Sequence, residues 1–300
     1  MSLLVIGRTG QLARSLQIAA RRTSMPLIAI GRPEIDVRRT ATVSQALDQH
    51  GPSIVVNAAA YTAVDKAERA PEEAKQLNAD GAGDLARACW QRRIPLIHIS
   101  TDYVFDGLKE APYSEDDRCN PINVYGQTKL EGERQVAEHH PQHVILRTSW
   151  VHSPFGGNFV GAILKASKNG LPLRVIDDQV GSPTYALDLA ETILNLALHV
   201  GQGDRRTFPW GVYHVCNAGE TSWYGLARAI IDKAIPEEDR PWIEPISTAA
   251  YGAAAARPAN SRLNCGKLSS SFGLALRDWR LGLEDCVGRI AGSPVEPGLR

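Results

Sequence analysis

The segment LLVIGRTGQLA, residues 3–13, joins a short apolar run to the glycine pattern G-x-x-G-x-x-A. Gly7 permits the tight turn after a strand, Gly10 lets backbone approach a pyrophosphate, and Ala13 is small enough for close packing of a helix on the strand. The N-terminus of the helix that follows would face the anion. Because the pattern stands at the start of a strand-turn-helix unit, it predicts a dinucleotide site, with a purely structural turn as the alternative.

Apolar runs and helical patterns alternate along the chain beyond this segment. The runs occupy residues 3–6, 27–30, 54–56, 96–99 and 144–146, and the helical patterns occupy residues 11–22, 41–50, 71–92 and 125–139. Short apolar strands that alternate with helices are typical of β-α-β units, in which helices cover both faces of a parallel sheet. Because the crossovers between such strands are right-handed, the expected fold is α/β, with a Rossmann-type doubly wound parallel sheet.

The alternation loosens after Ser149, where glycine and proline become frequent. A chain of 300 residues is long enough for one large or two modest domains. We therefore expect a dinucleotide-binding domain in residues 1–148 and a smaller α/β substrate-binding domain in most of residues 149–300, with segments around 184–217 returning to the first domain. Residues 291–300 lack apolar periodicity, which predicts a flexible tail. Four tryptophans are expected to fill the core of this half, with stacking on a base as the alternative: Trp210, Trp223, Trp242 and Trp279.

The balance of charge argues against a polyanionic partner. Lys plus Arg and Asp plus Glu each number 33, so the net charge is zero and nucleic acid is not an expected partner. The five cysteines form no C-x-x-C pair, which disfavours a zinc site or a disulfide framework and suits a reducing compartment. No apolar run approaches the roughly 18 residues of a membrane span, and the first run is too short for a signal peptide. These observations predict a cytoplasmic protein with no membrane contact, no structural zinc site and no metal-ligating residue among its candidate site residues.

The end of the second predicted strand bears on the choice of cofactor. NAD enzymes usually place an acidic residue there for the ribose hydroxyls, whereas an arginine accommodates the 2′-phosphate of NADP. Here the turn reads Gly31-Arg32-Pro33, and the first acidic residue is Glu34. NADPH is therefore the expected cofactor, with NADH as the alternative if Arg32 is only a solvated loop charge. Asp36 and Val37 are expected to bound the adenine pocket, unless Asp36 caps the next helix.

Tyr125 and Lys129 stand four residues apart in a predicted helix, which places both on one face. A tyrosine is a poor acid at neutral pH until a neighbouring ammonium stabilises its phenolate, so the pair predicts acid-base chemistry in which Lys129 lowers the pKa of Tyr125. Ser100 and Thr101 directly follow the fourth apolar run, where an open α/β sheet forms its ligand crevice. Their hydroxyls are expected to polarise a substrate carbonyl, although strand-end hydroxyls also satisfy local backbone groups.

Several longer motifs agree with this interpretation. They are GRTGQL at 7–12, NAAAYTAVDKAE at 57–68, STDYVFDG at 100–107, NVYGQTK at 123–129, LRTSW at 146–150, DQVGSPT at 178–184 and RPANS at 257–261. With these motifs the sequence resembles the extended short-chain dehydrogenases/reductases, and within them the dTDP-4-dehydrorhamnose reductase family. The resemblance spans almost the whole chain. It implies NADPH-dependent reduction of a dTDP-linked 4-keto-6-deoxy sugar, dTDP-4-dehydro-L-rhamnose, to dTDP-L-rhamnose, a precursor of cell-surface polysaccharide.

The resemblance and the motif reasoning together give three sets of site residues. The catalytic set is Thr101, Tyr125 and Lys129. The cofactor set is Gly7, Thr9, Gly10, Gln11, Leu12, Arg32, Asp36, Val37, Ala58, Ala59, Ala60, Tyr125 and Lys129. The substrate set is Val64, Asp65, Thr101, Asp102, Tyr103, Trp150, Arg257, Asn260 and Ser261.

Other functions stay open on the same fold. One is a different nucleotide-sugar reductase, epimerase or dehydratase, although dehydratases of this superfamily pair an aspartate with a glutamate after the threonine, and here Asp102 is followed by Tyr103. Another is a non-catalytic regulatory subunit like the β subunit of methionine adenosyltransferase, against which the intact catalytic set argues. Ser15 stands where some relatives carry an acidic residue linked to a divalent metal at a dimer interface. A need for Mg²⁺ therefore stays open, as does the choice between monomer and homodimer.

Overall fold

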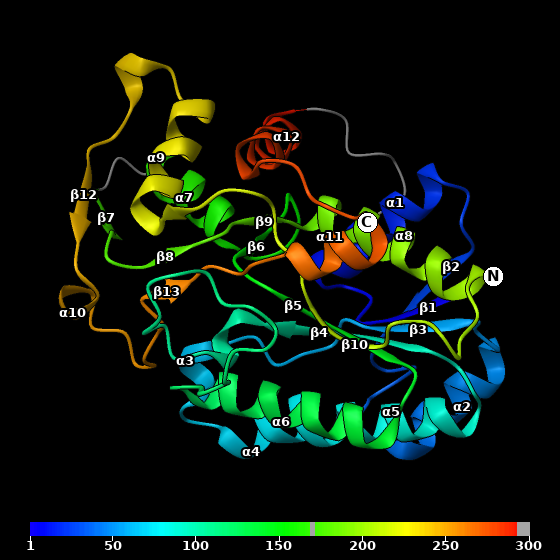
Figure 1. Cartoon of the computed structure of the whole chain (residues 1–300). Coiled ribbons are helices and arrows are strands. Elements are labelled where there is room, and N and C mark those ends of the chain that lie inside the picture. The colour runs from blue at the N-terminus through cyan, green and yellow to red at the C-terminus, as the bar shows by residue number, and fades with distance from the viewer. Residues whose placement is uncertain (169–171, 293–300) are drawn as a thin grey trace.

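A six-stranded parallel sheet forms the centre of the structure (Figure 1). The computed structural model describes residues 1–168 and 172–292. The strands of this sheet are β1 (Leu3–Ile6), β2 (Leu27–Ile30), β3 (Ile54–Asn57), β4 (Leu96–Thr101), β5 (His143–Thr148) and β10 (Gly211–His214). They lie in the order β10-β5-β4-β3-β1-β2, and every neighbouring pair is parallel. The expected doubly wound parallel sheet is confirmed.

Helices cover both faces of this sheet (Figure 1). One face carries α2 (Thr40–His50), α4 (Pro71–Lys75), α5 (Gly81–Gln91) and α6 (Val124–His139), and the other carries α1 (Gln11–Arg22), α8 (Ala186–Gln202), α11 (Gly266–Phe272) and α12 (Trp279–Ala291). Strand β1 shows why both layers are needed. Its residues Leu3 and Val5 belong to the core that includes α1 and α8, whereas Leu4 and Ile6 belong to the core that includes α2 and α5. A strand that is apolar on both faces must be covered on both.

The predicted helix over residues 71–92 is not continuous. It consists of α4, a π-helical turn η1 (Gln76–Asp80) and α5. In this turn the Asn78 side chain accepts a hydrogen bond from Tyr61 N–H at 2.8 Å and donates to the Thr128 hydroxyl at 3.1 Å. The wider turn therefore holds the loop after β3 against α6. Such π-helical turns are common near functional sites.

Small sheets and short helices make up much of the C-terminal half. β6 (Val151–His152) pairs with β9 (Thr184–Tyr185), β7 (Leu173–Ile176) pairs with β12 (Ile243–Ile246), and β8 (Val180–Gly181) lies between β11 (Thr221–Ser222) and β13 (Asn260–Ser261). The remaining elements here are α7 (Phe159–Lys168), α9 (Trp223–Ala234), α10 (Thr248–Tyr251) and the 3-10 turn η3 (Glu237–Asp239). By contrast, α8 packs on α1 and β10 extends the central sheet, so the chain returns to its first half over these two elements.

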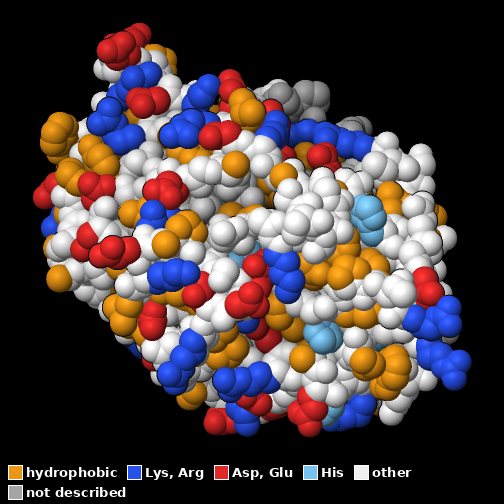
Figure 2. Space-filling model, viewed as in Figure 1, with side chains coloured by type: hydrophobic (Ala, Val, Ile, Leu, Met, Phe, Trp, Pro, Cys, Tyr) orange, Lys and Arg blue, Asp and Glu red, His pale blue; other side chains and the backbone are white. Residues whose placement is uncertain are grey.

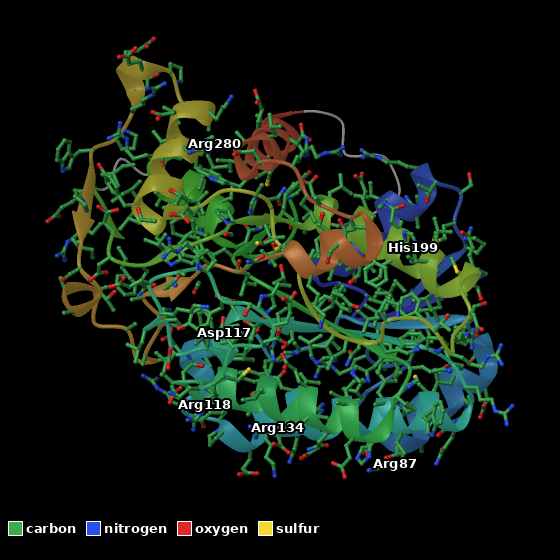
Figure 3. The ribbon with its side chains drawn as sticks, viewed as in Figure 1. Arg87, Asp117, Arg118, Arg134, His199 and Arg280 are labelled. Atoms are coloured by element: carbon green, nitrogen blue, oxygen red, sulfur yellow. The ribbon has the colours of Figure 1, made fainter. Side chains whose placement is uncertain are left out.

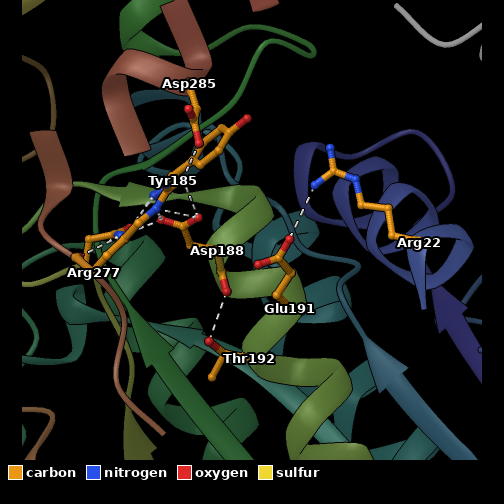
Figure 4. Close-up of polar contacts among 8 residues, drawn as sticks. Arg22, Tyr185, Asp188, Glu191, Thr192, Arg277 and Asp285 are labelled. Carbon is orange, nitrogen blue, oxygen red and sulfur yellow. Dashed lines mark hydrogen bonds and ion pairs between the residues drawn. The ribbon is translucent and has the colours of Figure 1, made fainter. Parts of the chain in front are cut away.

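An ion-pair cluster fixes the C-terminal helix to α8 (Figure 4). Arg277, just before α12, donates from Nη2 to the Asp188 carboxylate of α8 at 2.9 Å and to Asp285 of α12 at 2.5 Å. One turn further along α8, Glu191 pairs with Arg22 of α1 at 3.5 Å. These contacts join α1, α8 and α12 into one layer.

The surface and the chain end complete the description. Figure 2 shows positive and negative side chains interspersed over one face, in agreement with the zero net charge.

Among the helices of residues 1–168 and 172–292, none combines the length and the apolar character needed to cross a membrane. Helix α12 includes Ala291, and residues 293–300 of the expected flexible tail lie outside the described residues. Trp279 is 2% exposed as expected for the core, but Trp242 is 75% exposed, so the core prediction is wrong there.

Candidate active site

Two cavities open at the carboxyl ends of the central strands and share one wall. The first, of about 540 Å³, lies beside β4 and α6, and the second, of about 610 Å³, lies beside β1 and the end of β2. The shared wall comes from the loops after β1 and β3 and consists of Thr9, Gly10, Ala58, Ala60 and Thr62. The strand order reverses at this point, because β2 and β3 lie on opposite sides of β1. Open α/β sheets bind their ligands at such a reversal.

The loop between β1 and α1 is shaped for close backbone approach. Gly7 has a φ of +119°, and a Cβ atom there would stand 3.1 Å from the carbonyl carbon and oxygen of Ala58. Helix α1 begins after Gly10, and no side chain caps its first turn. The N–H groups of that turn therefore suit an anion such as a pyrophosphate. All the predicted loop residues line one or both cavities: Gly7, Thr9, Gly10, Gln11 and Leu12.

The second cavity carries an excess of positive side chains. Arg32, Asp36 and Val37 line it as predicted, together with Arg8, Arg38 and Glu73 and the three alanines after β3, Ala58, Ala59 and Ala60. The Asp36 carboxylate accepts hydrogen bonds from Arg38 Nε at 2.9 Å and Nη2 at 2.6 Å, and this contact lowers the pKa of Asp36 to about 2. Asp36 is engaged by Arg38 and Glu34 by Arg8 at 2.6 Å, so among the described residues at the end of β2 the cation outside these ion pairs is Arg32.

Thr101 and Tyr125 meet in the first cavity. Thr101 ends β4, and Tyr125 lies in the first turn of α6, which Asn123 caps by accepting a hydrogen bond from Gly126 N–H at 2.7 Å. Burial raises the pKa of Tyr125 to about 12, and hydrogen bonding with Thr101 opposes this rise. The Thr101 hydroxyl donates to Asp102 Oδ1 at 2.9 Å. Burial also raises the pKa of Asp102, which opens the 3-10 turn η2 (Asp102–Val104), to about 6.

Lys129 lies one helical turn after Tyr125, but its ammonium is directed to β4. It donates to the Ile99 carbonyl at 2.6 Å and lies 3.3 Å from His98 Nε2. Burial lowers the pKa of Lys129 to about 8, and the Glu133 carboxylate opposes that fall. Lys129 is expected to lower the pKa of Tyr125, and the structure differs from this expectation. The Lys129 ammonium is held at the strand, and burial has the largest effect on the pKa of the Tyr125 phenol.

The two strand-end hydroxyls have different partners. Ser100 donates to the Glu133 carboxylate of α6, whereas Thr101 lies with Tyr125. Successive side chains of a strand point to opposite faces, which accounts for the difference. Both residues line the first cavity, but the Ser100 hydroxyl is bound to Glu133, so Thr101 is the one of the two that lies with Tyr125.

An aromatic wall borders the same cavity. Trp150 stacks on Trp223 of α9, with ring centroids 3.6 Å apart and planes at 10°, and Tyr103 meets Tyr125 edge to face at 5.7 Å. Trp150 has a φ of +48°, a conformation that is strained for any residue except glycine. Val64, at the start of α3 (Val64–Ala67), also lines the cavity. Val64, Tyr103 and Trp150 are thus placed together as predicted, while Trp223 was expected in the core.

Four predicted substrate residues line neither cavity. Arg257 pairs with Asp65 of α3 at 2.7 Å, which holds the segment before β13 against α3 and lowers the pKa of Asp65. Asn260 donates to two backbone carbonyls of residues 109–111, at 2.6 and 3.0 Å, and Ser261 is buried next to it in β13. These residues join distant parts of the chain at the edge of the site.

Both cavities also contain residues outside the three predicted sets. The first includes Thr62, Thr148, Gly156, Gly157 and Trp223, and the second includes Arg38, Tyr61, Glu73 and Leu77. Tyr61 and Thr62 belong to the motif at residues 57–68, so that motif contained a usable signal. Arg38 follows the predicted Asp36 and Val37 directly. Its role depends on its ion pair with Asp36, and the spacing of residues in the sequence does not reveal that pair.

The described residues offer no obvious metal centre. Within residues 1–168 and 172–292, no three His, Cys, Asp or Glu side chains are grouped so that they could hold an ion. Ser15 is buried in α1, and its hydroxyl has no hydrogen-bond partner in this part of the chain.

Known proteins match this chain over nearly its full length. The family model described as RmlD substrate binding domain matches residues 1–291. A dTDP-4-dehydrorhamnose reductase of Sinorhizobium fredii is 43% identical over 285 residues, which cover 93% of this chain and 94% of that protein. The crystal structure of a dTDP-4-dehydrorhamnose reductase from Clostridium acetobutylicum has a TM-score of 0.90 and 32% identity, covering 97% of this chain and 100% of that one.

A second crystal structure, of dTDP-4-dehydrorhamnose reductase from Bacillus anthracis in complex with NADP, has a TM-score of 0.87 and 34% identity, covering 96% of this chain and 100% of that one. The match to the family model runs from the dinucleotide loop to the C-terminal helix. The chain therefore belongs to the RmlD substrate binding domain family, together with the dTDP-4-dehydrorhamnose reductases that it matches.

Proposed function

We propose that the protein is an NADPH-dependent reductase that converts the 4-keto group of dTDP-4-dehydro-L-rhamnose to the alcohol of dTDP-L-rhamnose. The observation that carries this proposal is the meeting of Thr101 and Tyr125 beside the dinucleotide loop, in a chain whose relatives are dTDP-4-dehydrorhamnose reductases. A hydroxyl and a phenol that converge on one point can hold and protonate a single carbonyl oxygen. A regulatory subunit would not require such a pair.

The residues around the shared wall fit a bound dinucleotide. The uncapped first turn of α1 suits the pyrophosphate, the small residues Ala58, Ala59 and Ala60 leave room beside β3, and Arg32 with Arg38 provides cations for a 2′-phosphate. The NADP complex of the Bacillus anthracis relative supports the same choice. When bound, NADPH supplies the hydride for C4 of the sugar.

Tyr125 supplies the proton in this proposal. Its raised pKa keeps the phenol protonated at neutral pH, and a positive charge near the oxygen would make it a stronger acid. Lys129 lies on the same helix face and brings that charge when its ammonium turns from the Ile99 carbonyl towards Tyr125. Thr101 holds the carbonyl oxygen in position for the transfer.

The sugar nucleotide would enter from the C-terminal side. We assign dinucleotide binding to residues 1–148 with the returning segments around 184–217, and substrate binding mainly to the rest of residues 149–300. Val64, Tyr103 and Trp150 would lie against the sugar. Arg257, held by Asp65 at the edge of the cavity, offers a cation to the diphosphate of the substrate. Asn260 and Ser261 act by holding this segment in place.

Arg32→Ala is expected to raise the Michaelis constant for NADPH by about 10-fold or more, because a charge-assisted hydrogen bond to phosphate is worth about 1.5 to 3 kcal/mol. The constant for NADH should change little, since NADH has no 2′-phosphate. Steady-state kinetics with both cofactors measure this. Arg21→Ala removes an exposed arginine of α1 that lines neither cavity and is the matched control. Equal weakening of NADPH and NADH would show that Arg32 does not bind the 2′-phosphate.

Tyr103→Phe is expected to raise the Michaelis constant for the sugar nucleotide about 2- to 10-fold, the range for loss of one neutral hydrogen bond. The phenol lines the first cavity next to Tyr125, far from the arginines of the second cavity. The dissociation constant for NADPH, from fluorescence titration, should therefore stay unchanged. Weaker NADPH binding with an unchanged sugar constant would contradict the assignment of Tyr103 to the substrate.

One assay tests the proposed function as a whole. NADPH oxidation is followed spectrophotometrically with dTDP-4-keto-6-deoxy-L-mannose, and the product is identified by NMR as the 4-hydroxy sugar. Incubation with dTDP-glucose and NAD⁺ is the parallel reaction. A dehydratase needs a second positioned acid-base group, which Tyr103 at the position after Asp102 supplies poorly. If a 4-keto-6-deoxy product forms from dTDP-glucose at an enzymatic rate, the reductase proposal is wrong.

A further inference from the structure

Helix α6 carries a third ionisable residue on the face of Tyr125 and Lys129. Glu133 follows Lys129 by four residues, so the three side chains stand one above another along the helix. The Glu133 side chain is only 4% exposed, whereas its neighbours Glu131 and Arg134 are 43% and 67% exposed. Figure 3 shows Arg134 on the outer side of the helical layer. Glu133 is therefore a carboxylate enclosed between the helix and the sheet.

The partners of this carboxylate lie on two neighbouring strands. Arg147 of β5 donates to it from Nε at 3.0 Å and from Nη2 at 2.7 Å, and the Arg147 side chain is only 5% exposed. Ser100 of β4 donates its hydroxyl to the same carboxylate. Ser100 and Arg147 are paired in the sheet, and the next pair along is Thr101 with Thr148, both of which line the first cavity.

This arrangement ties the helix to the sheet at the rim of the first cavity, which Ser100 itself lines, one residue before Thr101 and Thr148 end the two strands. A buried ion pair is weak evidence for stability, because removing both charges from water costs about as much as their attraction returns. Its best-attested use is to fix register between packed elements. A shift of α6 along the sheet would move Tyr125 relative to Thr101, and this one carboxylate holds both strands against such a shift.

Glu133 also acts on Lys129 through charge. Burial lowers the pKa of Lys129, and the Glu133 carboxylate is the group that opposes this fall. The other ionisable groups that face Lys129 are His98 on β4, which lies 3.3 Å from its Nζ, and Tyr125 on the same helix, while Arg147 on β5 lies beyond Glu133. Loss of the carboxylate would leave the ammonium less stable at neutral pH.

We infer that Glu133 is a positioning residue of the proposed reaction, which ties α6 to β4 and β5 so that Tyr125 and Lys129 stand in register with Thr101. The inference rests on the proposed reductase function. Glu133 does not line either cavity, so it acts through Tyr125 and Lys129 rather than by contact with substrate or cofactor.

The test compares Glu133→Gln with Glu131→Gln, which removes an exposed carboxylate from the same helix. For Glu133→Gln we expect kcat to fall about 10-fold, in line with the sensitivity of catalysis to small displacements, while the Michaelis constant for NADPH changes little. The basic limb of the pH profile should move to lower pH by about one unit, because an opposite charge near Lys129 is lost. Glu131→Gln should behave as wild type. Unchanged kcat and an unchanged basic limb in Glu133→Gln would overturn the inference.

Two further measurements keep the inference separate from folding and from the proposed function. If Glu133→Gln does not fold, Arg147→Lys keeps a cation beside Glu133 but removes the paired hydrogen bonds of the guanidinium, and an unchanged kcat there would overturn the inference. The titration of Lys129 is also followed in the absence of cofactor by NMR of [ε-¹³C]lysine, with the resonance identified by its loss in Lys129→Met. A wild-type protein that fails to reduce the sugar disproves the proposed function, whereas an unshifted Lys129 titration in Glu133→Gln disproves the role of Glu133.

Discussion

Replacing Tyr125 with phenylalanine is expected to lower kcat by about 10²- to 10⁴-fold, the usual contribution of general acid catalysis. The substitution removes only the phenol oxygen, and the ring keeps its edge contact with Tyr103. The dinucleotide loop at Gly7 and Gly10 is untouched, so NADPH should bind nearly as in the wild type. Single-turnover kinetics with a fluorescence titration of NADPH separate the two effects.

The matched control for this experiment is Tyr224→Phe. Tyr224 lies in α9, and its phenol contacts Arg228 at 3.3 Å outside both cavities. This variant should keep wild-type kcat. If Tyr125→Phe retains more than half of wild-type activity, Tyr125 is not the proton donor.

Gly126→Ala is expected to destabilise the fold strongly. A Cβ atom at Gly126 would stand 2.1 Å from the Tyr103 carbonyl oxygen, and a backbone carbonyl cannot move aside as a side chain can. Overpacking usually costs about 1 to 3 kcal/mol, and a backbone contact belongs at the upper end of that range. Helix α6 would have to move away from η2, which carries Asp102 and Tyr103. Activity should therefore be lost together with stability. Urea unfolding and kcat measure the two losses.

Gly288→Ala is also a replacement of glycine by alanine in a helix, but here the stability of the protein is expected to rise slightly. Gly288 lies exposed in α12, and a Cβ atom there would meet nothing within 4 Å. Alanine in a helix interior is favoured over glycine by about 0.5 to 1 kcal/mol, so this variant should be slightly more stable and fully active. A Gly126→Ala protein as stable and active as Gly288→Ala would show that α6 does not depend on close contact with η2.

The dinucleotide half of the site could be predicted because its signals are local. The apolar run, Gly7 and Gly10 are contiguous, and the helix they begin follows at once, so their spacing alone defines the loop. The helix over residues 71–92 was predicted as continuous because periodicity does not register a π-helical turn. That turn depends on Asn78, whose hydrogen-bond partners Tyr61 and Thr128 lie far from it in the sequence.

The direction of a side chain was harder to predict than its position. Lys129 was expected beside Tyr125 from helical spacing, and the structure places its ammonium on the Ile99 carbonyl because a long flexible side chain has several partners in reach. Ser100 was expected at the substrate, and it lines the first cavity, but its hydroxyl is bound to Glu133. The alternation of a strand separates its side chain from that of Thr101. Its partner Glu133 is 33 residues away, and only the packing of α6 on the sheet brings the two together.

The position of β10 at the end of the sheet has a consequence for synthesis of the chain. Strand β5 ends at residue 148 and all six of its residues are buried, but the strand that covers its outer edge begins only at residue 211. While the intervening segment is being translated, β5 presents unpaired backbone groups beside its apolar residues Val144, Ile145 and Leu146, the kind of edge that recruits strands from other chains. The nascent protein is therefore most prone to aggregate in this interval, after its cofactor loop is complete and before its last central strand emerges.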